Sequence, residues 1–363
     1  MESSDGSKSH VVGRGAQIKP PNRFQSSRLE EDLEHLAELD QIEDQRRTVA
    51  TRFLTDQSRS IITTNDSPDI PFRVSINPYR GCEHGCAYCY ARPGHEYLGM
   101  NAGLDFETNV LVKHDAADLL RDALNKPSWR CEPISISGVT DCYQPAERRF
   151  KITRSILEVL SEANHPAGII TKNSLVARDQ DLLASMAQRR LMHVFLSITT
   201  LDAELARRME PRTATPDARL RTIEQLTSAG VPVGVMVAPI IPGLNDEEIA
   251  HVLSAARDAG AVSASYVLLR LPLAVEPVFR DWLDRNVPLK KDRIEGLIRS
   301  SRDGKLSDAR FGSRMCGTGE YAKHLQQTFK VFRAKTGLDQ RMPPQDTSQF
   351  RPPLPRSGQL NLF

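Results

Sequence analysis

The stretch Cys82-Glu83-His84-Gly85-Cys86-Ala87-Tyr88-Cys89 holds three of the chain's six cysteines, at a C-x3-C-x2-C spacing. Its glycine and the proline that follows at Pro93 argue against a regular helix or a long strand. Three thiolates in one loop are ligands for a soft metal ion or an iron–sulfur cluster. A closed structural zinc site and a [4Fe–4S] cluster held only by protein each need four protein ligands. The triad therefore leaves one position for a ligand that is not protein, unless a distant fourth cysteine completes a zinc or purely structural site.

The composition is that of an ordinary globular enzyme. Charged residues make up 26% and apolar residues 39% of the 363 residues, and the net charge of +2 is too small to indicate nucleic acid or a membrane. No apolar run approaches the roughly 20 residues of a membrane-spanning helix, and residues 1–10 lack the apolar core of a secretory signal. We therefore expect a cytoplasmic protein without membrane contact, in which clustered cysteines are reduced ligands rather than disulfides.

One strand-like segment precedes the cysteine stretch, and strand-like and helix-like segments alternate after it. Regular alternation predicts parallel strands with right-handed crossovers. Six such units are fewer than the eight of a closed barrel, so the fold class is α/β, with an open, partial (β/α)6 barrel of the TIM type. The expected strands are residues 72–76, 133–137, 167–171, 193–198, 231–240 and 263–271, and the expected helices between them are 114–124, 153–163, 180–189, 217–229 and 246–259.

The rest of the chain is organised around this barrel, which we place at residues 68–275. Residues 1–52 form a polar, charged N-terminal segment, expected to be disordered to about residue 27 and then an exposed helix or linker. Residues 276–337 form a helical C-terminal extension, with helices near 278–283, 292–300 and 321–335. Residues 338–363 form a Pro-rich tail, expected to be disordered up to its last five residues.

Polar side chains follow several of the expected strands. The cysteine stretch follows the first strand, Thr140 the second and Lys172 the third, while Ser197 lies near the end of the fourth. In parallel β/α folds the functional site lies at the carboxyl ends of the strands. These residues are therefore expected on one face.

The cysteine spacing, placed after the first strand of a partial barrel, resembles the radical S-adenosylmethionine superfamily. Residues 82–92 and 137–145 are similar to the branch that includes spore photoproduct lyase and its uncharacterised bacterial relatives. The similarity runs from about residue 72 to residue 275. It implies that Cys82, Cys86 and Cys89 ligate three irons of a [4Fe–4S] cluster, and that S-adenosylmethionine chelates the fourth. It also implies reductive cleavage of S-adenosylmethionine to a 5′-deoxyadenosyl radical that abstracts hydrogen from a substrate, with a reductant such as flavodoxin or ferredoxin as partner.

The resemblance also assigns cofactor-binding residues. Tyr88 is expected beside the adenine and Thr140 near the methionine amino group. Lys172 and Ser197 match positions that the lyase branch uses toward the cofactor. An ammonium group suits the methionine carboxylate, and a hydroxyl suits the amine or the ribose.

One position departs from the lyase pattern. Photoproduct lyases carry a hydrogen-donating cysteine just ahead of the Ser/Thr-Asp pair after the second strand, where this chain has Gly138 and Val139. Cys142 lies just past Asp141 and is a candidate substitute donor. Its alternative is an inert packing residue, as expected for Cys131 and Cys316.

Other polar residues have a functional and a structural interpretation. His84 could be a ligand or proton donor, or could shape the loop. Asp141 could act as an acid or base, or could hold its loop by local hydrogen bonds. A basic cluster could contact phosphate, or could be the solvated start of a helix; it comprises Arg148, Arg149, Lys151 and Arg154.

The last five residues, Gln359-Leu360-Asn361-Leu362-Phe363, resemble the pentapeptide with which bacterial DNA polymerases and repair proteins bind the sliding clamp. A flexible tether would present Gln359 for polar contacts and Leu360, Leu362 and Phe363 as apolar anchors. The sequence therefore predicts a radical S-adenosylmethionine enzyme, lyase-like and connected with DNA repair, that acts on nucleic acid. The alternatives are a radical enzyme that acts on a small metabolite or a protein, and a non-catalytic iron–sulfur or zinc module that recruits partners through its tail.

Overall fold

A seven-stranded sheet forms the centre of the computed structural model, which describes residues 13–25 and 49–354. Six strands pair in parallel, and β2 pairs antiparallel with β3 at one edge. Within the described residues the order runs from β10 at one edge to β2 at the other without closing. This confirms the predicted open barrel. In order across the sheet, the strands are β10 (Ser263–Leu268), β9 (Val233–Ile240), β8 (Met192–Ser197), β7 (Ala167–Thr171), β6 (Ile134–Ile136), β3 (Val74–Ile76) and β2 (Ile62–Thr64).

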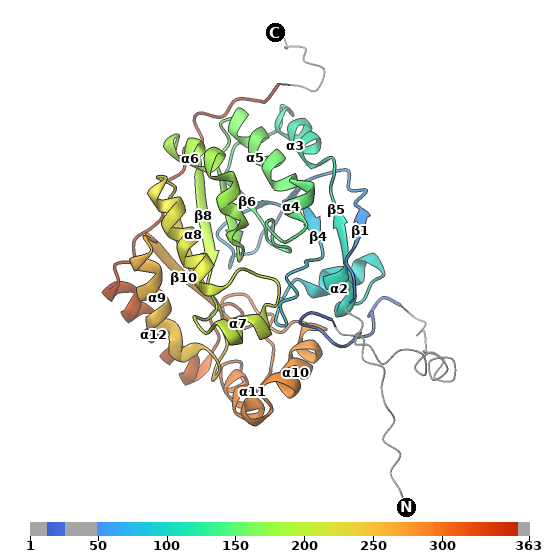
Figure 1. The fold of residues 1–363 in the computed structure, drawn as a ribbon, viewed down its shortest axis with the longest axis vertical. Coiled ribbons are helices and arrows are strands. Elements are labelled where there is room, and N and C mark those ends of the chain that lie inside the picture. Colours follow the sequence, from blue (N-terminus) through green and yellow to red (C-terminus); the bar gives the residue numbers. More distant parts are fainter. Residues whose placement is uncertain (1–12, 26–48, 355–363) are drawn as a thin grey trace, which may run out of the picture.

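Helices connect the parallel strands and cover the outer side of the curved sheet (Figure 1). In α5, the isoleucine and leucines of the predicted apolar face are fully buried against the strands. Burying such a side chain contributes about 1.5–3 kcal/mol, so this face holds the helix on the sheet. The barrel helices are α3 (Ala116–Leu124), α4 (Glu147–Phe150), α5 (Ile152–Glu162), α6 (Gln180–Gln188), α7 (Ala203–Met209), α8 (Pro216–Ser228) and α9 (Ile249–Asp258), and the C-terminal extension adds α10 (Val275–Asn286), α11 (Lys291–Ser300) and α12 (Gly319–Lys335).

A second, three-stranded sheet was not predicted. It has the order β1–β5–β4 and holds the chain that leads into the cysteine stretch. Its strands are short, and β1 begins at the last residue of the predicted charged N-terminal segment. The sheet comprises β1 (Arg52–Thr55), β4 (Tyr79–Arg80) and β5 (Asn109–Val112), followed around the cysteine stretch by the 3₁₀ helix η1 (Arg92–Leu98) and by α2 (Leu104–Thr108).

The structure corrects the extent of the segments predicted to be disordered. Residues 13–25 pack against the cysteine stretch and η1, with Ala16 fully buried. Residues 339–354 run along the amino ends of the strands. There, the Gln345 side chain donates to the Ala167 carbonyl at 2.7 Å, and the Arg351 amide donates to the Ala163 carbonyl at 2.9 Å. The predicted helix or linker falls largely outside the described residues, and so does the pentapeptide that resembles a clamp-binding motif.

A buried histidine lies under this C-terminal strap, residues 339–354. His165 is fully buried, the Trp129 indole donates to its Nε2 at 3.3 Å, and the Phe350 ring packs edge-on against it. Burial is the main cause that lowers the pKa of His165 to about 4 from 6.5. The unfolded chain therefore takes up this proton first as pH falls, and protonation favours unfolding.

The free energy of unfolding is accordingly expected to fall by about 2–3 kcal/mol through His165 as pH drops from 6.5 toward 4. His165→Gln should flatten this dependence in urea unfolding curves. His251→Gln, at an exposed position on α9, should retain it. Equal pH dependence in the wild type and His165→Gln would contradict the assignment.

Among the described residues, no helix is both long and apolar enough to cross a membrane.

Candidate active site

The cysteine stretch lies at the carboxyl end of β3, directly after β4, as predicted. Cys82 and Cys86 are buried, Cys89 is half-buried, and all three are free thiols. Cys89 packs against both of the small apolar clusters that contain Cys86 and Cys82. The loop therefore turns the three sulfur atoms toward one region.

The electrostatics of this region fit an iron–sulfur cluster. Burial raises the pKa of all three thiols, and for Cys86 the charges of Cys89 and Cys82 raise it further. Opposing this, Lys172 lowers the pKa of Cys86 and Cys89, and Arg92 lowers that of Cys89. Three buried thiols so close together ionise readily only when iron takes up their charge.

Within the described part of the chain, no group of three His, Cys, Asp or Glu side chains is arranged around a single metal ion. A cluster does not require that arrangement, because each thiolate binds a different iron. The three free thiols of the loop therefore fit the three protein-held irons of such a cluster.

A buried ion pair supports the cysteine loop. Arg92 and Glu107 are both fully buried and lie 2.5 Å apart, and Arg92 also donates to the Cys86 carbonyl at 2.7 Å. The Glu107 carboxylate accepts from the backbone amides of residues 14–16 at 2.8, 3.2 and 2.7 Å. A Cβ atom added at Gly15 would overlap the Gly85 carbonyl oxygen. The N-terminal segment thus packs directly on the cysteine loop.

His84 and Asp141 support the loop rather than face open space. His84 is 1% exposed, and its Nε2 lies 3.1 Å from the Asn173 amide. Burial lowers the pKa of His84 to about 4, so the ring is neutral near pH 7. The Asp141 carboxylate accepts from the Thr171 hydroxyl at 2.7 Å and from the Lys172 amide at 2.8 Å. The contacts match the structural interpretation of both residues.

Beside the loop, Tyr88 and Lys172 meet a buried carboxylate that the sequence analysis did not identify. The Tyr88 hydroxyl donates to Glu210, and the Lys172 ammonium lies 3.8 Å from Glu210 and 5.8 Å from the centre of the Tyr88 ring. Glu210 also pairs with buried Arg219 and accepts from Thr199. Two cations therefore pair with this one carboxylate beside the cysteines, and the charge of Asp141 also acts on Lys172.

The pKa values of Glu210 and Lys172 reflect both their burial and the charges around them. Burial raises the pKa of Glu210 even though Arg219 acts in the opposite direction. Burial lowers the pKa of Lys172 to about 8, and the charge of Cys86 partly offsets this. Lys172 is anchored by donation to the Ala238 carbonyl at 2.9 Å. It is thus a positioned cation beside the loop, as a partner for a carboxylate must be.

Each of the remaining predicted site residues has its own contacts within the protein. Ser197 is buried at the end of β8, where its carbonyl accepts from Arg219 at 2.8 Å. Thr140 lies on the loop after β6 and donates to the Tyr79 carbonyl at 3.3 Å. Cys142 is fully buried in the main apolar core, which supports its packing alternative. Cys131 and Cys316 are half-buried, as free thiols.

Comparison with known proteins connects this geometry to a family. The Radical SAM superfamily model matches residues 76–256. An uncharacterized protein of Mycobacterium tuberculosis is 41% identical over 232 residues, which cover 63% of this chain and 68% of the relative. An uncharacterized protein of Methanocaldococcus jannaschii is 29% identical over 213 residues, which cover 59% of this chain and 76% of the relative.

Solved structures show the same fold. A spore photoproduct lyase structure with bound AdoMet and dinucleoside spore photoproduct superposes with a TM-score of 0.55, at 16% identity over 78% of each chain. The residues matched by the family model include the cysteine loop and the strand ends around it. The chain therefore belongs to the radical SAM superfamily, whose cofactors are a [4Fe–4S] cluster and S-adenosylmethionine.

Proposed function

We propose that this protein is a radical enzyme whose substrate is nucleic acid carrying a damaged or modified base, on which it acts as a lyase in DNA repair. The observation that carries the radical chemistry is the cysteine loop with Lys172 and Tyr88 beside it. When bound, the reduced cluster would supply one electron for the cleavage of S-adenosylmethionine, and with it the radical chemistry that removes hydrogen from a substrate.

The chain's own residues hold and shield the cofactors. Cys82, Cys86 and Cys89 supply the cluster thiolates. Lys172 would pair with the methionine carboxylate and Tyr88 would lie beside the adenine, while Thr140 and Ser197 would supply hydroxyl groups. Glu210 and Arg219 position Tyr88 and Lys172 from behind. Such a positioned group of charges binds the cofactor without needing to reorganise.

Three observations support nucleic acid as the substrate class. The fold is that of a lyase whose structure contains a dinucleoside photoproduct. The tail resembles a clamp-binding motif. A pocket of about 270 Å³ beside the loop is lined by Arg148 and Arg212 and by no acidic residue. Because the Arg212 amide donates to the His84 carbonyl at 3.3 Å, this pocket adjoins the cysteine loop. The Arg212 guanidinium pairs with Glu83 at 2.8 Å, so Arg148 is the lining cation that would contact a phosphate.

Within the predicted basic cluster, only Arg148 lines this pocket. Arg154 pairs with Asp179 and Asp181, and Arg149 stacks on Phe150. The structure thus divides the cluster between a positive pocket and ordinary helix packing.

Anaerobic reconstitution tests the proposed chemistry. The full chain, supplied with iron, sulfide, dithionite and S-adenosylmethionine, should show a [4Fe–4S] spectrum and form 5′-deoxyadenosine. Bound zinc without cleavage would instead support a non-catalytic module. Mass spectrometry of 5′-deoxyadenosine formed with deuterated DNA, RNA or metabolite pools then tests the substrate class. Deuterium from metabolites alone would refute nucleic acid.

Lys172→Met is expected to weaken the affinity for S-adenosylmethionine by at least about tenfold, because a charge-assisted hydrogen bond contributes ~1.5–3 kcal/mol. The iron content should not change. Titrating the rate of 5′-deoxyadenosine formation against cofactor concentration measures the effect. Lys126→Met, at an exposed position after α3, is the matched control. Wild-type affinity in Lys172→Met would remove Lys172 from the cofactor site.

Deleting residues 359–363 is expected to abolish binding to a purified bacterial sliding clamp and to leave S-adenosylmethionine cleavage unchanged. Analytical gel filtration or surface plasmon resonance measures the binding. Leu362→Ala should reproduce the loss, because it removes an apolar anchor. Asn361→Ala should bind normally. If the truncated chain bound the clamp as tightly as the full chain, the tail would have another role.

A further inference from the structure

The loop between α11 and α12, residues 301–318, bridges the two edges of the open sheet. On one side, the Leu268 amide at the end of β10 donates to the Met315 carbonyl at 2.8 Å. On the other side, the Arg314 side chain donates to Asp69 at 2.7 Å, in the connection between β2 and β3. The loop therefore spans the lateral opening that an incomplete barrel leaves.

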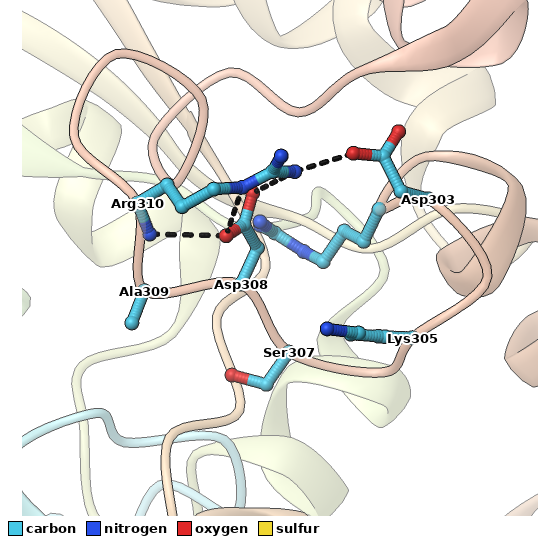
Figure 2. Close-up of a pocket in the computed structure, with 7 residues that line it drawn as sticks. Asp303, Lys305, Ser307, Asp308, Ala309 and Arg310 are labelled. Carbon is cyan, nitrogen blue, oxygen red and sulfur yellow. Dashed lines mark hydrogen bonds and ion pairs between the residues drawn. The ribbon is translucent and has the colours of Figure 1, made fainter.

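This bridging loop encloses a pocket of about 470 Å³, lined by side chains from residues 302–310. Figure 2 shows Arg310 held between Asp303 and Asp308, so that much of the acidic charge of the pocket is already paired. Lys305 makes no ion pair with the other lining residues drawn there. The lining side chains carry three cationic and two acidic groups, an excess of one positive charge.

Arg302 is the unusual member of this lining. It is 1% exposed, and one end of its guanidinium is fixed by donation to the Leu269 carbonyl. Its Nε and Nη1 atoms are buried and have no hydrogen-bond partner among the described residues. Burial is the main cause that lowers the pKa of Arg302 to about 10. Buried donors without acceptors cost free energy, and this cost disappears when a ligand accepts from them.

A second, half-buried arginine adds positive charge near Arg302, which Asp308 offsets in part. Arg270 follows β10, and its Nε also has no partner among the described residues. Its charge lowers the pKa of Arg302, so the two guanidinium groups lie near each other. The Arg270 guanidinium lies 5.6 Å from the centre of the Tyr90 ring, and Tyr90 directly follows Cys89. The pocket and the cysteine loop are thus linked through Arg270.

We propose that this pocket binds a phosphate-type oxyanion, with Arg302 and Lys305 as its donors. Guanidinium groups match the several acceptor oxygens of phosphate, and a dianion balances two neighbouring arginines better than a single carboxylate does. The source is either free phosphate or the phosphate of a nucleic-acid chain. The inference goes beyond the proposed function and does not rest on it, because free phosphate alone tests it.

Isothermal titration calorimetry of the reconstituted full chain with inorganic phosphate, at constant ionic strength maintained with chloride, measures the binding. We expect saturable binding that Arg302→Lys weakens by at least about tenfold, because lysine cannot replace the fixed, planar donor set. Lys305→Ala, at an exposed position that makes no packing contribution to the core, should weaken binding by roughly threefold to tenfold. Lys330→Ala, on the exposed side of α12, should bind as the wild type does.

A short single-stranded oligonucleotide added to the phosphate-loaded protein distinguishes the two sources. Displacement of phosphate, weakened in Lys305→Ala, assigns the pocket to a nucleic-acid phosphate; retention of phosphate assigns it to the free anion. The absence of saturable phosphate binding overturns the proposal, and so does binding that neither substitution changes. If Arg302→Lys does not fold, Lys305→Ala against Lys330→Ala decides the question. Neither failure affects the proposed radical chemistry, which is measured by 5′-deoxyadenosine formation.

Discussion

Replacing any one of Cys82, Cys86 and Cys89 with serine is expected to abolish both the [4Fe–4S] spectrum and the formation of 5′-deoxyadenosine. The three thiols lie in one loop, and burial raises the pKa of each. The charge of Cys89 raises the pKa of Cys82 and of Cys86 further. A serine hydroxyl does not ionise there, so one iron would lose its protein ligand. Iron and sulfide analysis after anaerobic reconstitution, together with chromatography of the cleavage product, measures both losses.

Two other cysteines provide matched controls for this experiment. Cys131 and Cys316 are also free, half-buried thiols, but neither belongs to the cysteine loop. Cys131→Ser and Cys316→Ser should retain the full iron content and activity. If a loop variant kept its cluster while Cys131→Ser or Cys316→Ser lost it, the ligand assignment would be wrong.

Glu107→Gln is expected to destabilise the protein by about 3–5 kcal/mol, because it leaves the buried Arg92 charge unpaired. It also weakens the acceptor for the backbone amides of residues 14–16. The N-terminal segment should therefore detach, and the cysteine loop should lose its support. Urea unfolding measures the stability, and the rate at which a chelator bleaches the cluster measures the exposure of the loop.

Glu132→Gln is the control for this second experiment. Glu132 pairs with Arg73, whose side chain is 63% exposed. Exposed pairs contribute about 0–1 kcal/mol, so both stability and cluster lifetime should stay near the wild-type values. Wild-type behaviour of Glu107→Gln in both assays would show that the ion pair and the N-terminal segment do not support the loop.

The barrel was predictable because its signals are local. Each strand of the parallel sheet is a short apolar run, and helices such as α5 and α8 repeat apolar residues at helical spacing. The order of these segments then determines a parallel topology. The 5-residue strand β7 was predicted at its observed boundaries, because Pro166 precedes it and polar Lys172 and Asn173 follow it.

The termini could not be predicted, because their structure depends on partners far along the chain. Residues 14–16 are ordered by Glu107, more than 90 positions away. Residues 345 and 351 bind backbone carbonyls of the barrel. Neither segment has periodicity of its own, so composition alone favours disorder. The β1–β5–β4 sheet escaped prediction for the same reason.

The site was predicted in part. Tyr88 and Lys172 do meet beside the cysteine loop. The carboxylate that joins them, Glu210, follows α7, and nothing in its local sequence marks it. The one indication in the sequence was the position of Thr199, a polar residue after the end of a strand, at the face where a site was expected. In the structure Thr199 donates to Glu210. A buried acid becomes identifiable only when the fold supplies its partners.

The C-terminal strap has a consequence for how the protein can be cut and oriented. Leu354 is fixed at the end of α5, where its amide donates to Glu162 at 2.8 Å. This point lies on the side of the sheet away from the cysteine loop, and Figure 1 shows the chain leaving the barrel there. A macromolecule bound by the residues after Leu354 would be held on the side of the sheet opposite the cysteine loop. The loop would then remain accessible to a substrate. A truncated protein should end after Leu354, because a chain cut at residue 338 would lack the strap that runs along the amino ends of the strands.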